Sequence, residues 1–123
     1  MSSVLGRFGV PGYAAYCTAK HGIIGFTKSL ALEVATAGIT VNALCPTWVD
    51  TAMAEQGIEE TAEIIGTTPE EFRRQAIAAV PIQRMVTPKE VADLVAYLSS
   101  DSASAITGQA INICGGATAG AGG

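Results

Sequence analysis

Positive charge is scarce in this chain of 123 residues, which has 7 Lys and Arg, 11 Asp and Glu, and a formal net charge of −4. Nucleic-acid binding calls for clustered Lys and Arg, so this balance argues against a nucleic-acid partner. Long apolar runs are also lacking, and no stretch approaches the length of a membrane span. The first residues show neither the basic region nor the apolar core of a signal peptide. We therefore expect a cytoplasmic protein with no membrane partner.

Cysteine and histidine are equally sparse. The three cysteines, Cys17, Cys45 and Cys114, lie far apart and form no C-x-x-C pair. A disulfide framework needs an even number of cysteines, and this chain has three. A zinc site needs closely spaced cysteine and histidine ligands, and the only histidine, His21, does not complete such a set. We expect three reduced, buried thiols and no metal site.

Aromatic residues make up only 6 % of the chain although 49 % of it is hydrophobic, so most apolar side chains are small and aliphatic. This apolar content excludes a disordered chain. Small aliphatic side chains suit helices that pack closely on a parallel sheet. At this length the chain fits one small domain, and its composition favours the α/β class.

Apolar side chains recur every three or four residues between residues 13 and 37, which predicts one long helix that ends at Gly38. The predicted apolar stripe consists of Ala19, Ile23, Phe26, Leu30 and Val34. Residues 1–12 should carry the end of a strand and a glycine-rich loop. The β-branched run at 39–45 predicts a buried strand.

The remaining residues predict three more helices and a second strand. The helices are expected at 52–65, at 69–79 and from residue 88 onward, and the last strand at 109–114. Thr68–Glu71 and Thr87–Glu90 both have the sequence of a capping box with proline at the first helical position. The glycine-rich tail after the last strand should be flexible.

Three polar residues near the start suggest proton chemistry. Tyr16 and Lys20 are four residues apart, so on a helix their Cβ atoms lie roughly 5–6 Å apart on one face. An ammonium group beside a phenol favours the phenolate and lowers its pKa, which suits the tyrosine to general acid–base catalysis. A hydroxyl from Ser3 could stabilise charge on the same substrate oxygen. The structural alternative is a half-buried tyrosine, a lysine whose stem covers apolar surface, and a turn serine.

These residues, in this order, resemble the short-chain dehydrogenase/reductase family. The resemblance includes Ser3, the Tyr16-x-x-x-Lys20 pair, and two later segments, residues 42–51 and 108–116. It implies the C-terminal half of a Rossmann-like, doubly wound parallel sheet: a long catalytic helix, a strand, lid helices, a further helix and the last strand. By this resemblance residues 1–123 form a partial NAD(P)-binding domain with a substrate lid at about 52–80. The N-terminal half, with its glycine-rich phosphate turn, is then absent from the sequence.

The resemblance also implies roles for individual residues. Tyr16 is the acid or base, Lys20 tunes it and holds the nicotinamide ribose, and Ser3 orients the substrate oxygen. The loop after the first strand matches the family's P-G-x-x-x-T at its proline and its threonine, while Thr47 replaces the glycine. The nicotinamide-binding residues implied by that match are Pro46, Thr47, Val49 and Thr51, and the implied substrate pocket contains Ser3, Trp48 and Met53. For Thr51, a helix N-cap is the structural alternative, and both roles can coexist.

The expected function is hydride transfer between NAD or NADP and a small-molecule carbonyl or secondary alcohol. Within the family the sequence looks most similar to 3-oxoacyl-(acyl carrier protein) reductases and to 3-hydroxybutyrate or cyclic-alcohol dehydrogenases. The resemblance also implies a dimer or tetramer. The alternative is a catalytically inactive truncated chain that acts through self-association or by docking to a full-length homologue.

Overall fold

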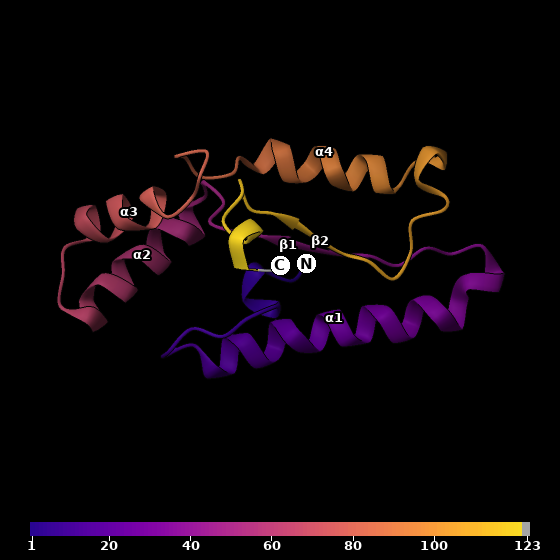
Figure 1. The fold of residues 1–123 in the computed structure, drawn as a ribbon, viewed down its shortest axis with the longest axis horizontal. Coiled ribbons are helices and arrows are strands. Elements are labelled where there is room, and N and C mark those ends of the chain that lie inside the picture. The colour runs from indigo at the N-terminus through magenta and orange to yellow at the C-terminus, as the bar shows by residue number, and fades with distance from the viewer. Residues whose placement is uncertain (122–123) are drawn as a thin grey trace.

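The computed structural model describes residues 1–121, and its helices and strands follow the predicted order (Figure 1). The elements are α1 (Ala14–Val34), β1 (Ala43–Pro46), α2 (Ala52–Ile65), α3 (Pro69–Ala78), α4 (Pro88–Leu98) and β2 (Ala110–Ile113), together with four short 3-10 helices. Within these residues, none of the helices combines the length and the apolar character needed to cross a bilayer.

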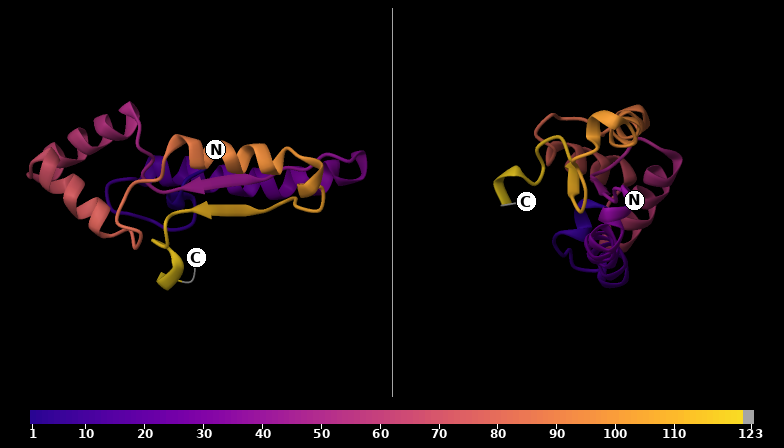
Figure 2. Two further views of the ribbon diagram at one scale, coloured as in Figure 1. Left: turned by 90° about the horizontal axis from the view of Figure 1, so that it is seen from above. Right: turned by 90° about the vertical axis from the view of Figure 1, so that its right-hand side faces the viewer.

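The two strands form a parallel pair in which Ala43 lies opposite Ala110 and Pro46 opposite Ile113. Helix α1 covers one face of the pair and α4 lies over the other (Figure 1). Both strands run toward α2 and α3, which project beyond their carboxyl ends (Figure 2). Open α/β sheets bind ligands at this end, so the predicted lid stands over the ligand-binding edge of the sheet.

On the sheet side, small side chains form the contact with α1. Ile24 of α1 packs against Ala43 and Cys45 of β1, with Ile23 and Ala110 at the margin. Alternate residues of a strand point to opposite faces, so Leu44 points toward α4 instead. There it lines a hollow of about 270 Å³ with Val95 and Leu98 of that helix. All three cysteines are buried, as the sequence predicted.

The buried face of α1 differs from the predicted stripe. The buried residues are Cys17, Ile24, Thr27 and Ala31, whereas Phe26 of the predicted stripe is 65 % exposed. Apolar residues occur all around this helix, so their spacing alone does not select the side that meets the sheet. The sheet covers the side that carries Ile24, which packs against β1, and side-chain size does not distinguish this side, because alanines and glycines also lie on the exposed side of the helix.

Both strands are shorter than predicted, and the predicted N-terminal strand is absent from the described residues. Before β1, Val41 N bonds to the Thr107 hydroxyl and Asn42 Nδ2 donates to Ile106 O, so side chains share the pairing with the backbone bond from Gly108 N to Val41 O. At the N-terminus a single backbone bond, from Ser2 N to Leu44 O at 2.8 Å, reaches the outer edge of β1. Residues Val4–Gly6 then form a 3-10 helix.

Threonine caps three of the four α-helices, and one of the two predicted capping boxes is complete. At α4 the Thr87 side chain accepts from Glu90 N while the Glu90 side chain accepts from Thr87 N. At α3 the Thr68 side chain accepts from Glu71 N, but the Glu71 carboxylate binds Arg74 and Gln75 instead of returning to Thr68. The predicted N-cap at Thr68 is therefore confirmed, whereas the predicted return bond from the Glu71 side chain to Thr68 is wrong.

The tail after β2 is built of turns up to residue 121, and its flexibility stays a prediction. Thr118 is buried, and its hydroxyl accepts a 2.9 Å hydrogen bond from Asn112 Nδ2. Residues Ala119–Ala121 form a 3-10 helix. The part of that prediction that concerns residues 122–123 lies outside the described residues.

Candidate active site

Tyr16 and Lys20 lie one above the other on the first turns of α1. The Lys20 Nζ atom stands 5.4 Å from the centroid of the Tyr16 ring. Tyr16 is 46 % exposed, so a substrate can approach its phenol. The helix thus brings together the two residues that the sequence paired, with the ammonium group over the aromatic face.

The N-terminal segment packs directly on α1 at Lys20. Ser2 Oγ donates to Lys20 O at 2.9 Å, and Lys20 Nζ donates to Met1 O at 3.2 Å. A Cβ atom at Gly6 would lie 2.9 Å from Lys20 O and would also clash with Ser2 Oγ. Glycine at this position therefore permits the close approach that fixes residues 1–6 beside Lys20.

Ser3 lies within this segment and is 8 % exposed. Its Oγ accepts a hydrogen bond from Leu5 N at 3.1 Å and caps the short 3-10 helix. Ser3 therefore has the local role of a turn serine. The hydrogen bonds between this segment and Lys20 come from Ser2 and Met1. A hydroxyl has one donor hydrogen besides its lone pairs, so Ser3 can still donate to a substrate oxygen.

The loop after β1 is held by backbone hydrogen bonds at the carboxyl ends of the strands. Pro46 is the last residue of β1, and Thr47 N donates to Ile113 O at 3.1 Å. Val49 forms a parallel bridge with Val86. This places the predicted nicotinamide-binding residues in one fixed loop at the ligand-binding edge.

Thr51 ends this loop and starts α2. Its Oγ1 accepts a hydrogen bond from Ala54 N at 3.2 Å and donates to Val49 O at 3.3 Å. The N-cap role considered from the sequence is therefore present. The residue is exposed and its oxygen has a second lone pair, so it can also accept from a ligand amide.

The two side chains predicted to line the substrate pocket have different surroundings. The Trp48 ring meets the Phe72 ring edge-on at 6.2 Å, and it also lies against the backbone of α2 at Gly57. Met53 is 83 % exposed on α2. Trp48 thus joins the loop to both α2 and α3, whereas the Met53 side chain is exposed to solvent.

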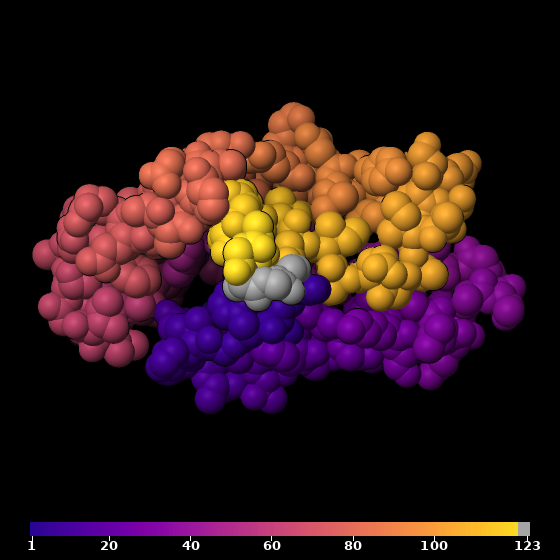
Figure 3. Space-filling model, in the orientation of Figure 1, coloured from indigo at the N-terminus to yellow at the C-terminus, as the bar shows by residue number. Residues whose placement is uncertain are grey.

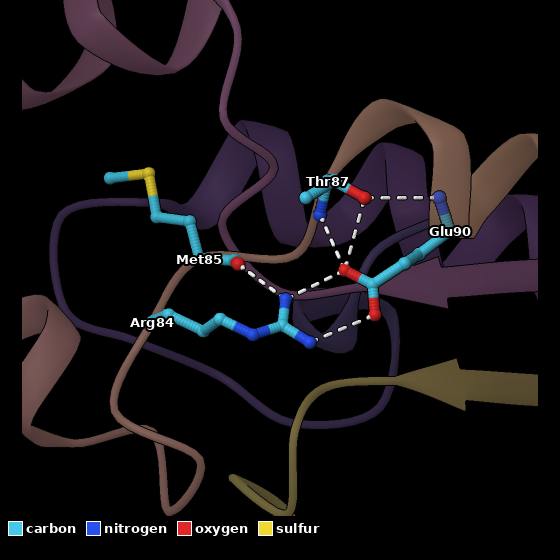
Figure 4. Close-up of polar contacts among 4 residues, drawn as sticks. All are labelled: Arg84, Met85, Thr87 and Glu90. Atoms are coloured by element: carbon cyan, nitrogen blue, oxygen red, sulfur yellow. Dashed lines mark hydrogen bonds and ion pairs between the residues drawn. The ribbon is translucent and has the colours of Figure 1, made fainter.

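The segment between α3 and α4 is fixed by an ion pair between Arg84 and Glu90 (Figure 4). Arg84 Nη1 and Nη2 donate to the two oxygens of Glu90 at 2.7 and 3.1 Å, and Nη1 also donates to Met85 O. The hydrogen bond from Arg84, followed by those from Thr87, lowers the pKa of Glu90 to about 2. This contact anchors the connector between α3 and α4.

Tyr13, which the sequence analysis did not single out, lies between α2 and Tyr16. A hydrogen bond of 2.6 Å joins its Oη to Thr61 Oγ1 on α2. Its ring meets the Tyr16 ring edge-on, with centroids 6.4 Å apart. The surface is hollowed where the N-terminal segment faces α2 and α3 (Figure 3). The only sequence signal was the three-residue spacing of the two tyrosines.

Together these features make a site suited to proton transfer at the end of a parallel sheet. An exposed phenol with an ammonium group at its ring stands beside a segment that carries a buried serine hydroxyl. A tightly bonded loop ending in Thr51 lies at the carboxyl edge of the strands, where ligands bind in this fold class. This fold and these residues define a short-chain dehydrogenase/reductase.

Comparison with known proteins agrees. A family model described as enoyl-(acyl carrier protein) reductase matches residues 1–118, and the chain belongs to the short-chain dehydrogenase/reductase family. A Streptomyces coelicolor relative, provisionally named a ketoacyl reductase, is 48 % identical over 116 residues, which are 94 % of this chain and 44 % of the relative. The 3-oxoacyl-(acyl carrier protein) reductase of Rickettsia felis is 43 % identical over the same shares of the two chains.

Solved structures share the fold. A variant of the actinorhodin polyketide ketoreductase with NADPH superposes with a TM-score of 0.89 at 49 % identity, covering 94 % of this chain and 44 % of that one. An NAD⁺-bound xylitol dehydrogenase gives a TM-score of 0.88 at 35 % identity, covering 94 % and 46 %. The chain thus spans a little under half the length of these relatives.

Proposed function

We propose that this chain carries the proton-transfer half of an NAD(P)-dependent ketoreductase. The observation that carries the proposal is the position of Lys20 Nζ, 5.4 Å from the centroid of an exposed Tyr16 ring, at the end of α1 that lies beside the lid. The relatives named as ketoacyl and 3-oxoacyl reductases support a 3-oxoacyl compound as the substrate class. A hydroxyacid or cyclic alcohol is the second class that the sequence predicted.

In this proposal Tyr16 Oη donates a proton to the oxygen of the ketone as that oxygen gains negative charge. Lys20 supplies positive charge beside the phenol and so favours the tyrosinate left behind. Ser3 donates a hydrogen bond to the same substrate oxygen, which stabilises the developing charge. In the oxidative direction Tyr16 accepts the proton from the alcohol.

The residues of the loop after β1 suit a nicotinamide. Thr51 Oγ1 keeps a lone pair for the carboxamide, and the loop backbone from Pro46 to Val49 is held rigid by β2 and by Val86. Bound NADH or NADPH would supply the hydride. In this proposal Lys20 also binds the ribose hydroxyls, and Thr47 occupies the position of the glycine in the family pattern.

The alternative is an inactive chain that acts by self-association or by docking to a homologue. The observation that favours it is the exposed apolar surface of α1, where Phe26 and Leu32 project away from the sheet. The same surface supports the predicted homo-oligomer of an active enzyme. The oligomer, the roles of the site residues and the cytoplasmic location remain predictions.

The test is turnover of acetoacetyl-CoA by the purified chain with NADPH and, separately, NADH. The chain is assayed alone and mixed with the part of the Streptomyces coelicolor relative that it does not cover. We expect NADPH or NADH oxidation in one of these samples, and its loss in the Tyr16→Phe variant. Full activity in that variant would remove Tyr16 from the reaction. No cofactor binding in either sample, together with stable self-association, would favour the inactive alternative.

A further inference from the structure

We infer that Tyr13 is a positioning residue that ties the lid helix α2 to the catalytic end of α1. The inference rests on the proposed function for the meaning of the site. The tie itself is a single contact, the 2.6 Å hydrogen bond between Tyr13 Oη and Thr61 Oγ1. The two residues are 48 positions apart and both are half-buried, so the bond joins separate elements and is partly shielded from water.

Two other contacts of α2 and α3 involve different parts of the molecule. An ion pair joins Glu55 of α2 to Arg73 of α3, and Trp48 of the loop after β1 packs edge-on against Phe72. These contacts hold the two lid helices together and fix their base. The Tyr13–Thr61 bond connects the lid to α1, the helix that carries Tyr16, and so acts on a different part of α2.

The other end of the tie touches the proposed acid directly. The Tyr13 ring stands at 77° to the Tyr16 ring, with the centroids 6.4 Å apart. Edge-to-face packing at this distance orients both rings. Tyr13 therefore contacts the lid through its hydroxyl and Tyr16 through its ring, and it sets how far α2 stands from the phenol that a substrate must reach.

This geometry separates two effects. Tyr13 has no place in the proton transfer, so loss of its hydroxyl leaves the chemical step intact. The lid is then less well held over the site, and substrate binding weakens. A neutral hydrogen bond of this kind corresponds to about a three- to tenfold change in an equilibrium constant. We expect that change in KM, with kcat nearly constant.

The variants are Tyr13→Phe and Thr61→Val, each of which removes one hydroxyl and keeps the shape of the side chain. Thr61→Ser keeps the hydroxyl and is the matched control. Hydrogen–deuterium exchange is followed in the peptide that covers residues 52–65. We expect about three- to tenfold faster exchange in both hydroxyl-deleted variants and the native rate in Thr61→Ser. The double variant should exchange no faster than either single one, because both remove the same bond.

The kinetic arm uses the ketoreductase assay described above. A rise in KM at constant kcat supports positioning, whereas a fall in kcat at constant KM reports a smaller fraction of folded protein and contradicts it. Unchanged exchange of residues 52–65 in both hydroxyl-deleted variants overturns the inference, whether or not the chain turns over. If the native protein shows no turnover, the proposed function fails, and the exchange result alone decides whether the tie exists.

Discussion

At the start of α4, Thr87 and Glu90 exchange hydrogen bonds and Pro88 occupies the first helical position, whereas at the start of α1 Tyr13 holds the N-cap position without a side-chain cap. Helix α1 also lacks an acidic residue in its first turn. By the local rules that govern helix ends, α4 begins well and α1 begins poorly. The poorly started helix carries the proposed catalytic pair.

The difference shows where local stability gives way to function. A serine, threonine or aspartate at position 13 would cap α1, but it would remove the phenol that reaches Thr61. Proteins tend to break local rules at functional sites and to compensate elsewhere. Here the compensation is the N-terminal segment, which packs on α1 at Lys20 and holds that end of the helix from the side.

Of the variants that compare α1 with α4, Tyr16→Phe should have the largest effect, and this effect is on the turnover rate. Loss of a general acid lowers the rate about 10²–10⁴-fold, while the free energy of unfolding should stay nearly constant because the ring is kept. Tyr97→Phe on α4 is the matched control, since Tyr97 is 47 % exposed and Tyr16 46 %. Steady-state kinetics of both variants measures the loss of rate, and chemical denaturation measures the free energy of unfolding. Equal turnover rates for the two variants would show that Tyr16 of α1 is not the general acid.

The next effect tests the compensation at α1. Gly6→Ala should destabilise the protein by about 1–3 kcal/mol, because overpacking forces backbone apart, here the 3-10 helix and Lys20 O. Gly9→Ala in the same segment is the control, since a Cβ there meets nothing within 4 Å. Urea denaturation measures both changes. Equal stability of the two variants would mean that the segment does not hold α1 in place.

A smaller effect compares the two threonine-capped starts of α3 and α4. Thr87→Ala should cost about 1 kcal/mol of stability, as loss of an N-cap does. Thr68→Ala should cost less, because Glu71 at that helix start binds Arg74 and not the cap. Thermal unfolding of the two variants gives the ranking. The reverse order would show that the reciprocal bond from Glu90 contributes nothing.

The smallest effect is a dependence on pH at the start of α4. The pKa of Glu90 is lowered from 4.5 to about 2, so its contribution to stability is complete above about pH 4.5 and is lost as the pH falls toward 2. The group is exposed, and solvent screening keeps the contribution small. Glu90→Gln should flatten this part of the stability–pH curve. A curve with the native slope in that variant would assign the dependence to other carboxylates.

Elements whose two ends are both encoded locally could be predicted from the sequence. Helix α2 has the predicted bounds because Thr51 caps its start and Gly66 adopts a left-handed conformation at its end. The order of elements and the Tyr16–Lys20 pair followed from spacing in the same way. The family match also agrees with the resemblance given by those motifs.

Features that depend on distant partners could not be predicted. The regular pairing of β1 starts only at Ala43, because the side chains of Asn42 and Thr107 take some of the hydrogen bonds before it. The buried face of α1 depends on the sheet that covers it. The capping box at Thr68 is incomplete because Arg74 lies one turn ahead of Glu71, whereas Arg84 lies behind Glu90 and holds it at the cap.

The position of Trp48 has a spectroscopic consequence. It is the only tryptophan in the chain, and its indole lies at the junction of the loop after β1, Gly57 of α2 and Phe72 of α3. The tryptophan emission of the protein therefore comes from one fluorophore, at the junction of the sheet with α2 and α3. Its emission wavelength and anisotropy report the movement of α2 and α3 against the sheet, without any added label.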